Sequence, residues 1–212
     1  MKLFGFTLEI MNWLYMLGIT FVAAYLIGSI PTGYIIVKAK TGEDIRNIGS
    51  GSTGATNVKR VLGTPYFFIV MILDALKGAL PVVLATLFVS FKSELGIPAV
   101  VAAIAVIIGH SKPLFLNFKG GKSVATGVGT ILALNWIVGL IVAAVWGVIT
   151  YTTKYVSVGS IIAVALAPVL MFVFHMPVAY VVYCAIGAVY IIYLHRENVK
   201  RLLKGEENKV RK

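Results

Sequence analysis

The sequence predicts an all-α polytopic membrane protein with seven transmembrane helices, some of them short or broken, in a single domain spanning residues 1–212. Of the 212 residues, 59% are hydrophobic and only 13% are charged, whereas a soluble domain carries about 25% charged residues. Several apolar runs reach the roughly 18 residues that mark a membrane-spanning helix. These runs are continuous rather than alternating, which argues against a membrane β-barrel.

The first three spans are expected at Leu8–Val37, Pro65–Val89 and Ile97–Gly109. The stretch Gly28–Gly33 interrupts the first span near its end, where Pro31 lacks a backbone donor and predicts a kink or an early helix end. A polar loop is expected over residues 38–63. A short, nearly neutral loop near Lys92 and Glu94 is expected between the second and third spans.

The central stretch Gly109–Thr126 (GHSKPLFLNFKGGKSVAT) is basic and lies between long apolar runs. Further apolar segments follow at 124–150, 156–174 and 178–194. Lysine and arginine in the 38–63 loop, the central stretch and the tail predict that all three are cytoplasmic. An even number of spans must then follow Lys122, so the 124–150 segment is expected to turn near Asn135. Seven spans result, with the N-terminus outside and the C-terminus cytoplasmic.

The first half of the divided segment, Val124–Leu134, is unusually short. At 1.5 Å per residue it extends about 16 Å, and a bilayer core is about 30 Å thick. We therefore expect that protein shields this helix, or that the preceding loop dips into the membrane.

The net charge of +11 does not indicate a nucleic-acid partner. Positive charges gather in the cytoplasmic loops of membrane proteins, which accounts for the excess. The single cysteine, Cys184, lies within an apolar run, excludes an internal disulfide and is expected to pack there. Three scattered histidines and one cysteine form no metal-ligand pattern, so no metal site is predicted.

Two glycine-rich segments carry the strongest functional signal. They are GSGSTGATN at 49–57 and KGGKS at 119–123, on the same predicted side and flanked by Lys or Arg. Backbone N–H groups freed by glycine bind phosphate well, especially beside helix N-termini. The alternative is that small residues only permit close helix packing. The second segment is not a Walker P-loop, because Leu116 stands where that motif needs glycine and no strand precedes it.

Other polar residues leave alternatives open. Asp74 and Lys77 share one helix face and are expected to form an ion pair, although an ion relay is the functional alternative. His110 fits loop bracing as well as chemistry, and His195 fits a base as well as a polar anchor. A transporter for a phosphorylated solute suits the broken helices, but the polar groups gather at one face rather than at the midplane.

Three ordered blocks make the chain similar to the PlsY family of bacterial acyl-phosphate:glycerol-3-phosphate acyltransferases. They are GSIPTGY at 28–34 followed by RNIGSGSTGATNVKR at 46–60, the central stretch at 109–126, and HRENVKRLLKGEE at 195–207. The DALKG run at 74–78 matches as well, and the resemblance covers about residues 23–209. The family usually has Asn at the position of Ser52 and commonly a smaller residue at that of Ser123, which bears on fine contacts only.

The resemblance implies a reaction and a location. Acyl phosphate and sn-glycerol 3-phosphate would give 1-acyl-glycerol 3-phosphate (lysophosphatidic acid) and phosphate, without a cofactor, in bacterial phospholipid biosynthesis. The His-x4-Asp motif of other glycerolipid acyltransferases is absent after every histidine. The family fold has seven spans with the blocks facing the cytoplasm, in the inner membrane. Expected partners are these two substrates, membrane lipids and an upstream enzyme that makes the acyl phosphate.

Site residues are carried over from the matching blocks. Lys122, His195 and Asn198 are expected to be catalytic, with Lys122 offsetting charge and the other two positioning or deprotonating the glycerol hydroxyl. Whether His195 is a base or only orients substrate stays open, because the leaving phosphate is also a plausible base. Substrate contacts are expected from Arg46, Ser50, Thr53, Asn57, Arg60, Gly120, Gly121, Ser160 and Glu207.

Overall fold

The computed structural model describes residues 2–89 and 95–210, so the expected loop near Lys92 and Glu94 lies outside the described residues. Within those ranges the regular structure is helical and contains no strand. The helices are α1 (Lys2–Gly28), α2 (Thr32–Thr41), α3 (Ala55–Leu62), α4 (Thr64–Phe88), α5 (Ile97–Ser111), α6 (Val124–Leu134), α7 (Trp136–Thr153), α8 (Val156–Val173), α9 (Val178–Leu194) and α10 (Arg196–Leu203). Short 3-10 turns are η1 (Ile45–Asn47) and η3 (Leu114–Leu116).

The expected apolar segments are helices, and most are long enough to cross a membrane. In the described part of the chain, five segments have the necessary length and hydropathy, or six if the bent pair α9–α10 counts as one span. The turn expected near Asn135 is confirmed, since α6 ends at Leu134 and α7 starts at Trp136. The all-α prediction is confirmed, while the count of seven spans and the orientation of the termini stay predictions.

The first span is broken where the sequence predicts. Helix α1 ends at Gly28 and α2 starts at Thr32, and Pro31 between them has no N–H with which to continue the helix. Ser29 fixes the break, because its hydroxyl donates to the Tyr25 carbonyl (2.8 Å) and accepts from the Leu114 N–H (3.3 Å). The break is thereby attached to the central stretch.

The prediction of a loop over residues 38–63 was wrong in part, because this segment contains regular structure. Helix α2 continues to Thr41 and ends at Gly42, whose φ of 76° suits glycine. Asp44 then caps η1 by accepting the Arg46 N–H (2.9 Å). Helix α3 follows from Ala55. A polar composition conceals these helices, since they bury only a narrow apolar face, as in the cluster of Val37, Ile45, Val58 and Val70.

Glycines set the closest helix crossings. A Cβ on Gly28 of α1 would lie 2.4 Å from the Val106 carbonyl oxygen of α5, and one on Gly109 would lie 2.3 Å from the Tyr25 carbonyl oxygen of α1. Helices α4 and α6 approach in the same way. A Cβ on Gly78 would lie 2.2 Å from the Thr126 carbonyl oxygen. Small residues therefore do the packing work that lipid-embedded helices require.

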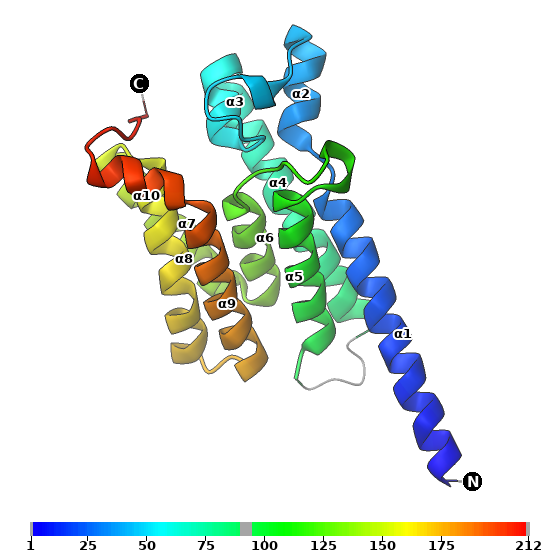
Figure 1. The fold of residues 1–212 in the computed structure, drawn as a ribbon. Coiled ribbons are helices and arrows are strands. Elements are labelled where there is room, and N and C mark those ends of the chain that lie inside the picture. The colour runs from blue at the N-terminus through cyan, green and yellow to red at the C-terminus, as the bar shows by residue number, and fades with distance from the viewer. Residues whose placement is uncertain (1, 90–94, 211–212) are drawn as a thin grey trace.

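Protein shields the short helix α6. It packs against α4, α5, α7, α8 and α9, and lies between α5 and the group α7–α9 (Figure 1). Its buried residues are Thr126, Gly127, Gly129, Thr130, Ile131 and Leu134. The expectation that protein surrounds this helix is confirmed.

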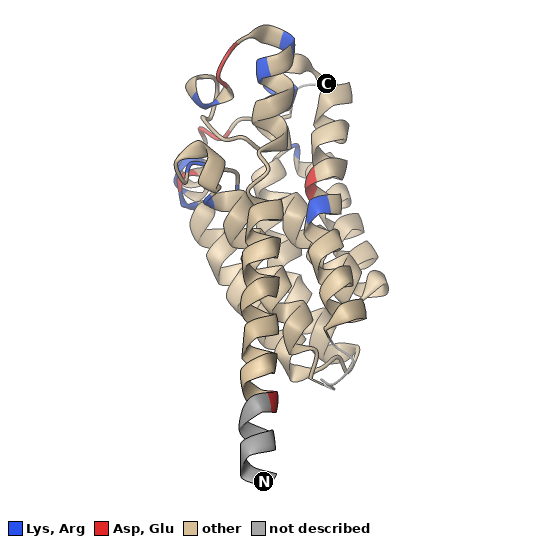
Figure 2. Ribbon diagram, turned by 90° about the vertical axis from the view of Figure 1, so that its right-hand side faces the viewer, with Lys and Arg blue, Asp and Glu red and all other residues tan. Residues whose placement is uncertain are grey.

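Charged residues gather at one end of the bundle. Among the residues that the structure describes, most Lys, Arg, Asp and Glu lie at the end that carries α2, α3 and α10 (Figure 2). Long helical stretches toward the other end carry no charged residue. The 38–63 segment, the central stretch and the tail thus share one end of the bundle, as the even number of spans predicted after Lys122 requires.

A test of the α4–α6 crossing uses Gly129→Ala. Its Cβ would lie 1.9 Å from the Ala75 carbonyl oxygen, so backbone must move, at a cost of about 1–3 kcal/mol. We expect a lower melting temperature in detergent. Gly147→Ala is the matched control, because nothing lies within 4 Å of its Cβ position. Equal melting temperatures for the two variants would contradict the crossing.

Candidate active site

The central stretch folds back onto the end of α5. Helix α5 extends through Ser111, so His110 belongs to its last turn rather than to the loop. The Gly121 N–H donates to the His110 carbonyl (3.1 Å), which closes the turn. Ser123 then adopts a left-handed φ of 61° before α6 begins. Glycine would adopt that conformation at a lower cost than serine does.

A hydrogen-bonded network starts at Lys122. The Lys122 ammonium donates to the Asn198 side-chain oxygen, and the Asn198 amide donates to Glu207 Oε1 (2.6 Å). Glu207 also accepts from the Ser157 hydroxyl (2.8 Å) and from Arg201 Nε (2.7 Å). The network joins the central stretch, α8, α10 and the tail. Lys122 of the second block is therefore brought together with Asn198 and Glu207 of the third.

His195 is buried at the junction of α9 and α10, with 4% of its surface exposed. Its Nδ1 lies 2.8 Å from the Ile191 carbonyl oxygen, which can only accept, so Nδ1 carries the hydrogen and Nε2 is left as an acceptor. Burial, with a smaller contribution from Lys122, lowers the pKa of His195 to about 4. The imidazole is thus neutral at pH 7.

Burial and hydrogen bonds also shift the pKa values of Lys122 and Glu207. Burial, reinforced by Arg201, lowers the pKa of Lys122 to about 8, so it is mainly a cation at pH 7. For Glu207 burial alone would raise the pKa, but hydrogen bonds from Asn198, Ser157 and Arg201 outweigh it and lower the pKa. The network therefore presents a cation that is only partly hydrated, which strengthens its interaction with an anion.

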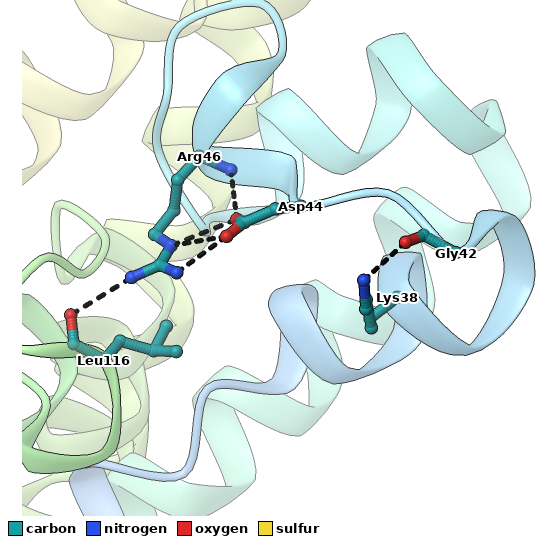
Figure 3. Close-up of polar contacts among 5 residues, drawn as sticks. All are labelled: Lys38, Gly42, Asp44, Arg46 and Leu116. Carbon is teal, nitrogen blue, oxygen red and sulfur yellow. Dashed lines mark hydrogen bonds and ion pairs between the residues drawn. The ribbon is translucent and has the colours of Figure 1, made fainter.

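Arg46 connects the first glycine segment to the central stretch (Figure 3). Its guanidinium bonds the Asp44 carboxylate through Nε (3.0 Å) and Nη2 (2.6 Å), and donates from Nη1 to the Leu116 carbonyl (3.3 Å). The hydrogen bond from Arg46 lowers the pKa of Asp44. Beside this pair, the Lys38 ammonium donates to the Gly42 carbonyl.

Asn57 organises the 49–57 segment from within. It is 1% exposed, its side-chain oxygen accepts from the Ser50 N–H (3.1 Å), and its amide donates to the Ile48 and Ser52 carbonyls (2.9 Å each). Thr53 is buried next to Gly33 of α2. The segment is therefore preshaped by its own asparagine.

Two further predicted residues, Arg60 and Ser160, make no hydrogen bond with the described members of the Lys122 network. Arg60 is exposed, but its charge acts on Lys122. Ser160 lies in α8 with its hydroxyl between the Val156 carbonyl (2.8 Å) and Trp146 Nε1 (3.3 Å), so its described contacts are within α7 and α8.

Three residues of the site were missed by sequence reasoning. Arg201 is three residues after Asn198 and Ser157 one turn before Ser160, so helical spacing could have indicated both. The sequence indicated Asp44 less clearly, because a carboxylate two residues from an arginine does not match the spacing of a helix face.

The chain matches the family model described as glycerol-3-phosphate acyltransferase over residues 18–205. The chain belongs to the glycerol-3-phosphate acyltransferase family. This confirms the resemblance that the three blocks indicated.

Relatives of the glycerol-3-phosphate acyltransferase family match along nearly their whole length. The chain is 44% identical to a glycerol-3-phosphate acyltransferase of Trichormus variabilis, with 93% of each chain covered, and 43% identical to one of Gloeobacter violaceus, with 94% of this chain and 97% of the relative covered. It is 40% identical to a crystal structure of PlsY, an integral membrane glycerol 3-phosphate acyltransferase in its glycerol 3-phosphate form. That match has a TM-score of 0.86 and covers 94% of this chain and 96% of the other. The prediction of a polytopic membrane acyltransferase is confirmed.

His195 makes the stability of this acyltransferase sensitive to acid. The unfolded imidazole takes up a proton below its ordinary pKa of 6.5, whereas the buried one resists protonation down to about 4. The contribution of His195 to stability is therefore complete above pH 6.5 and is lost as pH falls toward 4, by up to about 3 kcal/mol. Melting temperatures in detergent between pH 7.5 and 4.5 should fall more steeply for wild type than for His195→Gln. His175→Gln, at an exposed turn, should follow wild type; a wild-type slope in His195→Gln would contradict the assignment.

Proposed function

We propose that this acyltransferase moves an acyl group from acyl phosphate to the 1-hydroxyl of sn-glycerol 3-phosphate. The hydroxyl oxygen bonds to the acyl carbonyl carbon, the bond from that carbon to the phosphate oxygen breaks, and 1-acyl-glycerol 3-phosphate and phosphate leave. The observation that carries the proposal is the Lys122–Asn198–Glu207 network beside the neutral His195, in a chain of this family. An acyl phosphate is already activated, so no protein nucleophile is needed.

In this proposal Lys122 offsets the charge that develops on the carbonyl oxygen and the leaving phosphate. A partly buried cation stabilises such charge better than one in water. Asn198 and Glu207 hold the ammonium in place. His195 accepts a hydrogen bond from the glycerol hydroxyl at Nε2, and the leaving phosphate takes the proton. An imidazole whose pKa is about 4 is a weak base, which favours orientation over proton transfer.

Phosphate contacts come from both glycine segments. We propose contacts from Ser50 and Thr53 of the first segment, from Arg46 and Arg60 that flank it, and from Gly120 and Gly121 beside Lys122 of the second. Arg46 keeps N–H groups beyond those given to Asp44 and Leu116, since guanidinium has five donors. Asn57 and Ser160 already bond within the protein, so we propose that Asn57 shapes the phosphate site and that Ser160 supports it.

The acyl chain is proposed to lie along α9. An open apolar groove of about 540 Å³ is lined by Ala185, Ile186, Val189, Tyr190 and Tyr193. The Tyr190 hydroxyl is hydrogen bonded to Ser111 Oγ (2.8 Å) at the end of α5. The groove thus leads along the helix that ends beside His195.

We also propose the setting of this activity. The single domain of residues 1–212 lies in the bacterial inner membrane, with seven spans, the N-terminus outside and the site facing the cytoplasm, in line with its basic end. An upstream enzyme supplies the acyl phosphate. The direct experiment supplies purified protein with both substrates, and should release phosphate and lysophosphatidic acid in equal amounts.

Lys122→Ala is expected to reduce turnover by about 10²–10³-fold, because it removes the cation from the transition state. The melting temperature should stay within a few degrees of wild type, since alanine at this loop position leaves the helices intact. Lys112→Ala is the charge-matched control, with an exposed side chain in the same stretch, and should stay near wild type. Near-normal turnover of Lys122→Ala would remove this lysine from the mechanism.

His195→Gln is expected to keep activity within about tenfold of wild type, because glutamine also presents an acceptor to the hydroxyl, whereas His195→Ala should lose about 10²–10³-fold. Turnover of both variants between pH 6 and 9 is the measurement. An equal loss in the two variants would instead support proton transfer by the imidazole.

A further inference from the structure

A second polar cluster lies buried beneath the central stretch, and the proposed reaction does not use it. Asp74 and Lys77 of α4 form an ion pair (2.8 Å) with side-chain exposures of 3% and 8%. Thr32 donates to Asp74 Oδ1, and the Lys77 ammonium donates to the Ile30 carbonyl (2.8 Å). The ion pair predicted from the sequence is confirmed, and it also holds the break between α1 and α2.

This cluster is too tightly packed to be a ligand site. The space between its residues and the α1–α2 break does not admit a water-sized sphere. The cluster as described therefore has no space for a transported ion. Any effect that the cluster has on the site must act through the residues that it contacts.

His110 is the group through which the cluster reaches the central stretch. It is 6% exposed, and its Nδ1 lies 3.7 Å from Asp74 Oδ1 and has no hydrogen-bond partner among the described residues. On its other side the ring touches Gly121, where a Cβ would lie 2.1 Å from Nε2. The ring thus fills the space between Asp74 and Gly121.

The backbone of His110 holds the same turn. Its carbonyl accepts the Gly121 N–H (3.1 Å), and a Cβ on Gly120 would lie 2.2 Å from that carbonyl oxygen. Both glycines are therefore required by contact with a single residue. Lys122 follows directly, so the place of its backbone is determined by where the turn rests.

We propose that His110 is a positioning residue, whose ring, supported by Asp74 and Lys77, fixes the Gly120–Gly121 turn and thereby the position of Lys122. This role rests on the proposed function of Lys122. The ring is rigid and enclosed, so the turn cannot sink toward α4. A displacement of about 1 Å at a reacting group can reduce turnover by about 10²-fold. The cluster also anchors the α1–α2 break, through Thr32 and the Ile30 carbonyl.

The decisive experiment is a double-mutant cycle. Gly121→Ala should lower kcat/KM for glycerol 3-phosphate by about 10²-fold, because its methyl group meets the His110 ring. His110→Ala should lower kcat and raise KM, because the turn loses its support. The double variant should be at least tenfold more active than Gly121→Ala, because the methyl group then fills the space left by the ring.

Two further variants separate positioning from chemistry and from general destabilisation. His110→Phe keeps the ring and loses no hydrogen bond at Nδ1, so it should stay within about tenfold of wild type. Gly139→Ala, whose Cβ would lie 2.7 Å from the Leu132 Cα near the other end of α6, should lower the melting temperature without raising KM. If the double variant is no better than Gly121→Ala, or His110→Phe is as impaired as His110→Ala, the proposal is wrong.

Failure of the proposed function would be distinguishable. Wild type would then release no lysophosphatidic acid, and melting temperatures would still report whether His110→Ala relieves Gly121→Ala. Relief in the melting temperatures supports the contact, and its absence overturns it.

Discussion

The arrangement of the site depends on the hydrogen bonds that the Glu207 carboxylate accepts. Its two oxygens accept three side-chain hydrogen bonds, one from Ser157 of α8 and two from Asn198 and Arg201 of α10, and Asn198 in turn accepts from Lys122. A partly buried carboxylate is costly unless such donors surround it. The tail therefore stays folded against the bundle because the carboxylate needs donors that only the other segments supply. Without it, the Lys122 ammonium would lose the neighbour that fixes its partner amide.

Close backbone contact performs a similar role within the bundle. Helices that share an apolar solvent gain little from hydrophobic burial, so they depend on packing through small residues. The pairs α1–α5 and α4–α6 cross at glycines that leave no space for a methyl group. These crossings hold the ends of α5 and α6, and the central stretch connects those two ends. The position of the Gly120–Gly121 turn therefore derives from contacts well inside the bundle.

Periodicity and composition predicted the parts of the structure that follow from local chemistry. The break at Pro31 and the Asp74–Lys77 pair each depend on a neighbouring backbone or one helical turn. The turn near Asn135 was predicted differently, from the even number of spans required between the basic segments. The contacts of His110 with Asp74 and Gly121 are instead tertiary, and no spacing in the sequence encodes them. The polar helices α2 and α3 were concealed for another reason, since their stabilising face is only a few residues wide. Gly120 and Gly121 were expected to bind phosphate, with close packing as the alternative, and the His110 contacts show that packing requires both glycines.

The shortness of α6 has a consequence for how two unlike substrates meet. Thr126, near its start, packs against Gly78, 14 residues into α4, or about 21 Å along that helix. The turn that bears Lys122 is therefore recessed into the bundle rather than raised above it. A fatty chain drawn into water costs about 0.8 kcal/mol per methylene. In the proposed reaction a recessed Lys122 avoids that extraction, because the small, soluble glycerol phosphate moves into the bundle while the acyl chain stays at its depth in the bilayer.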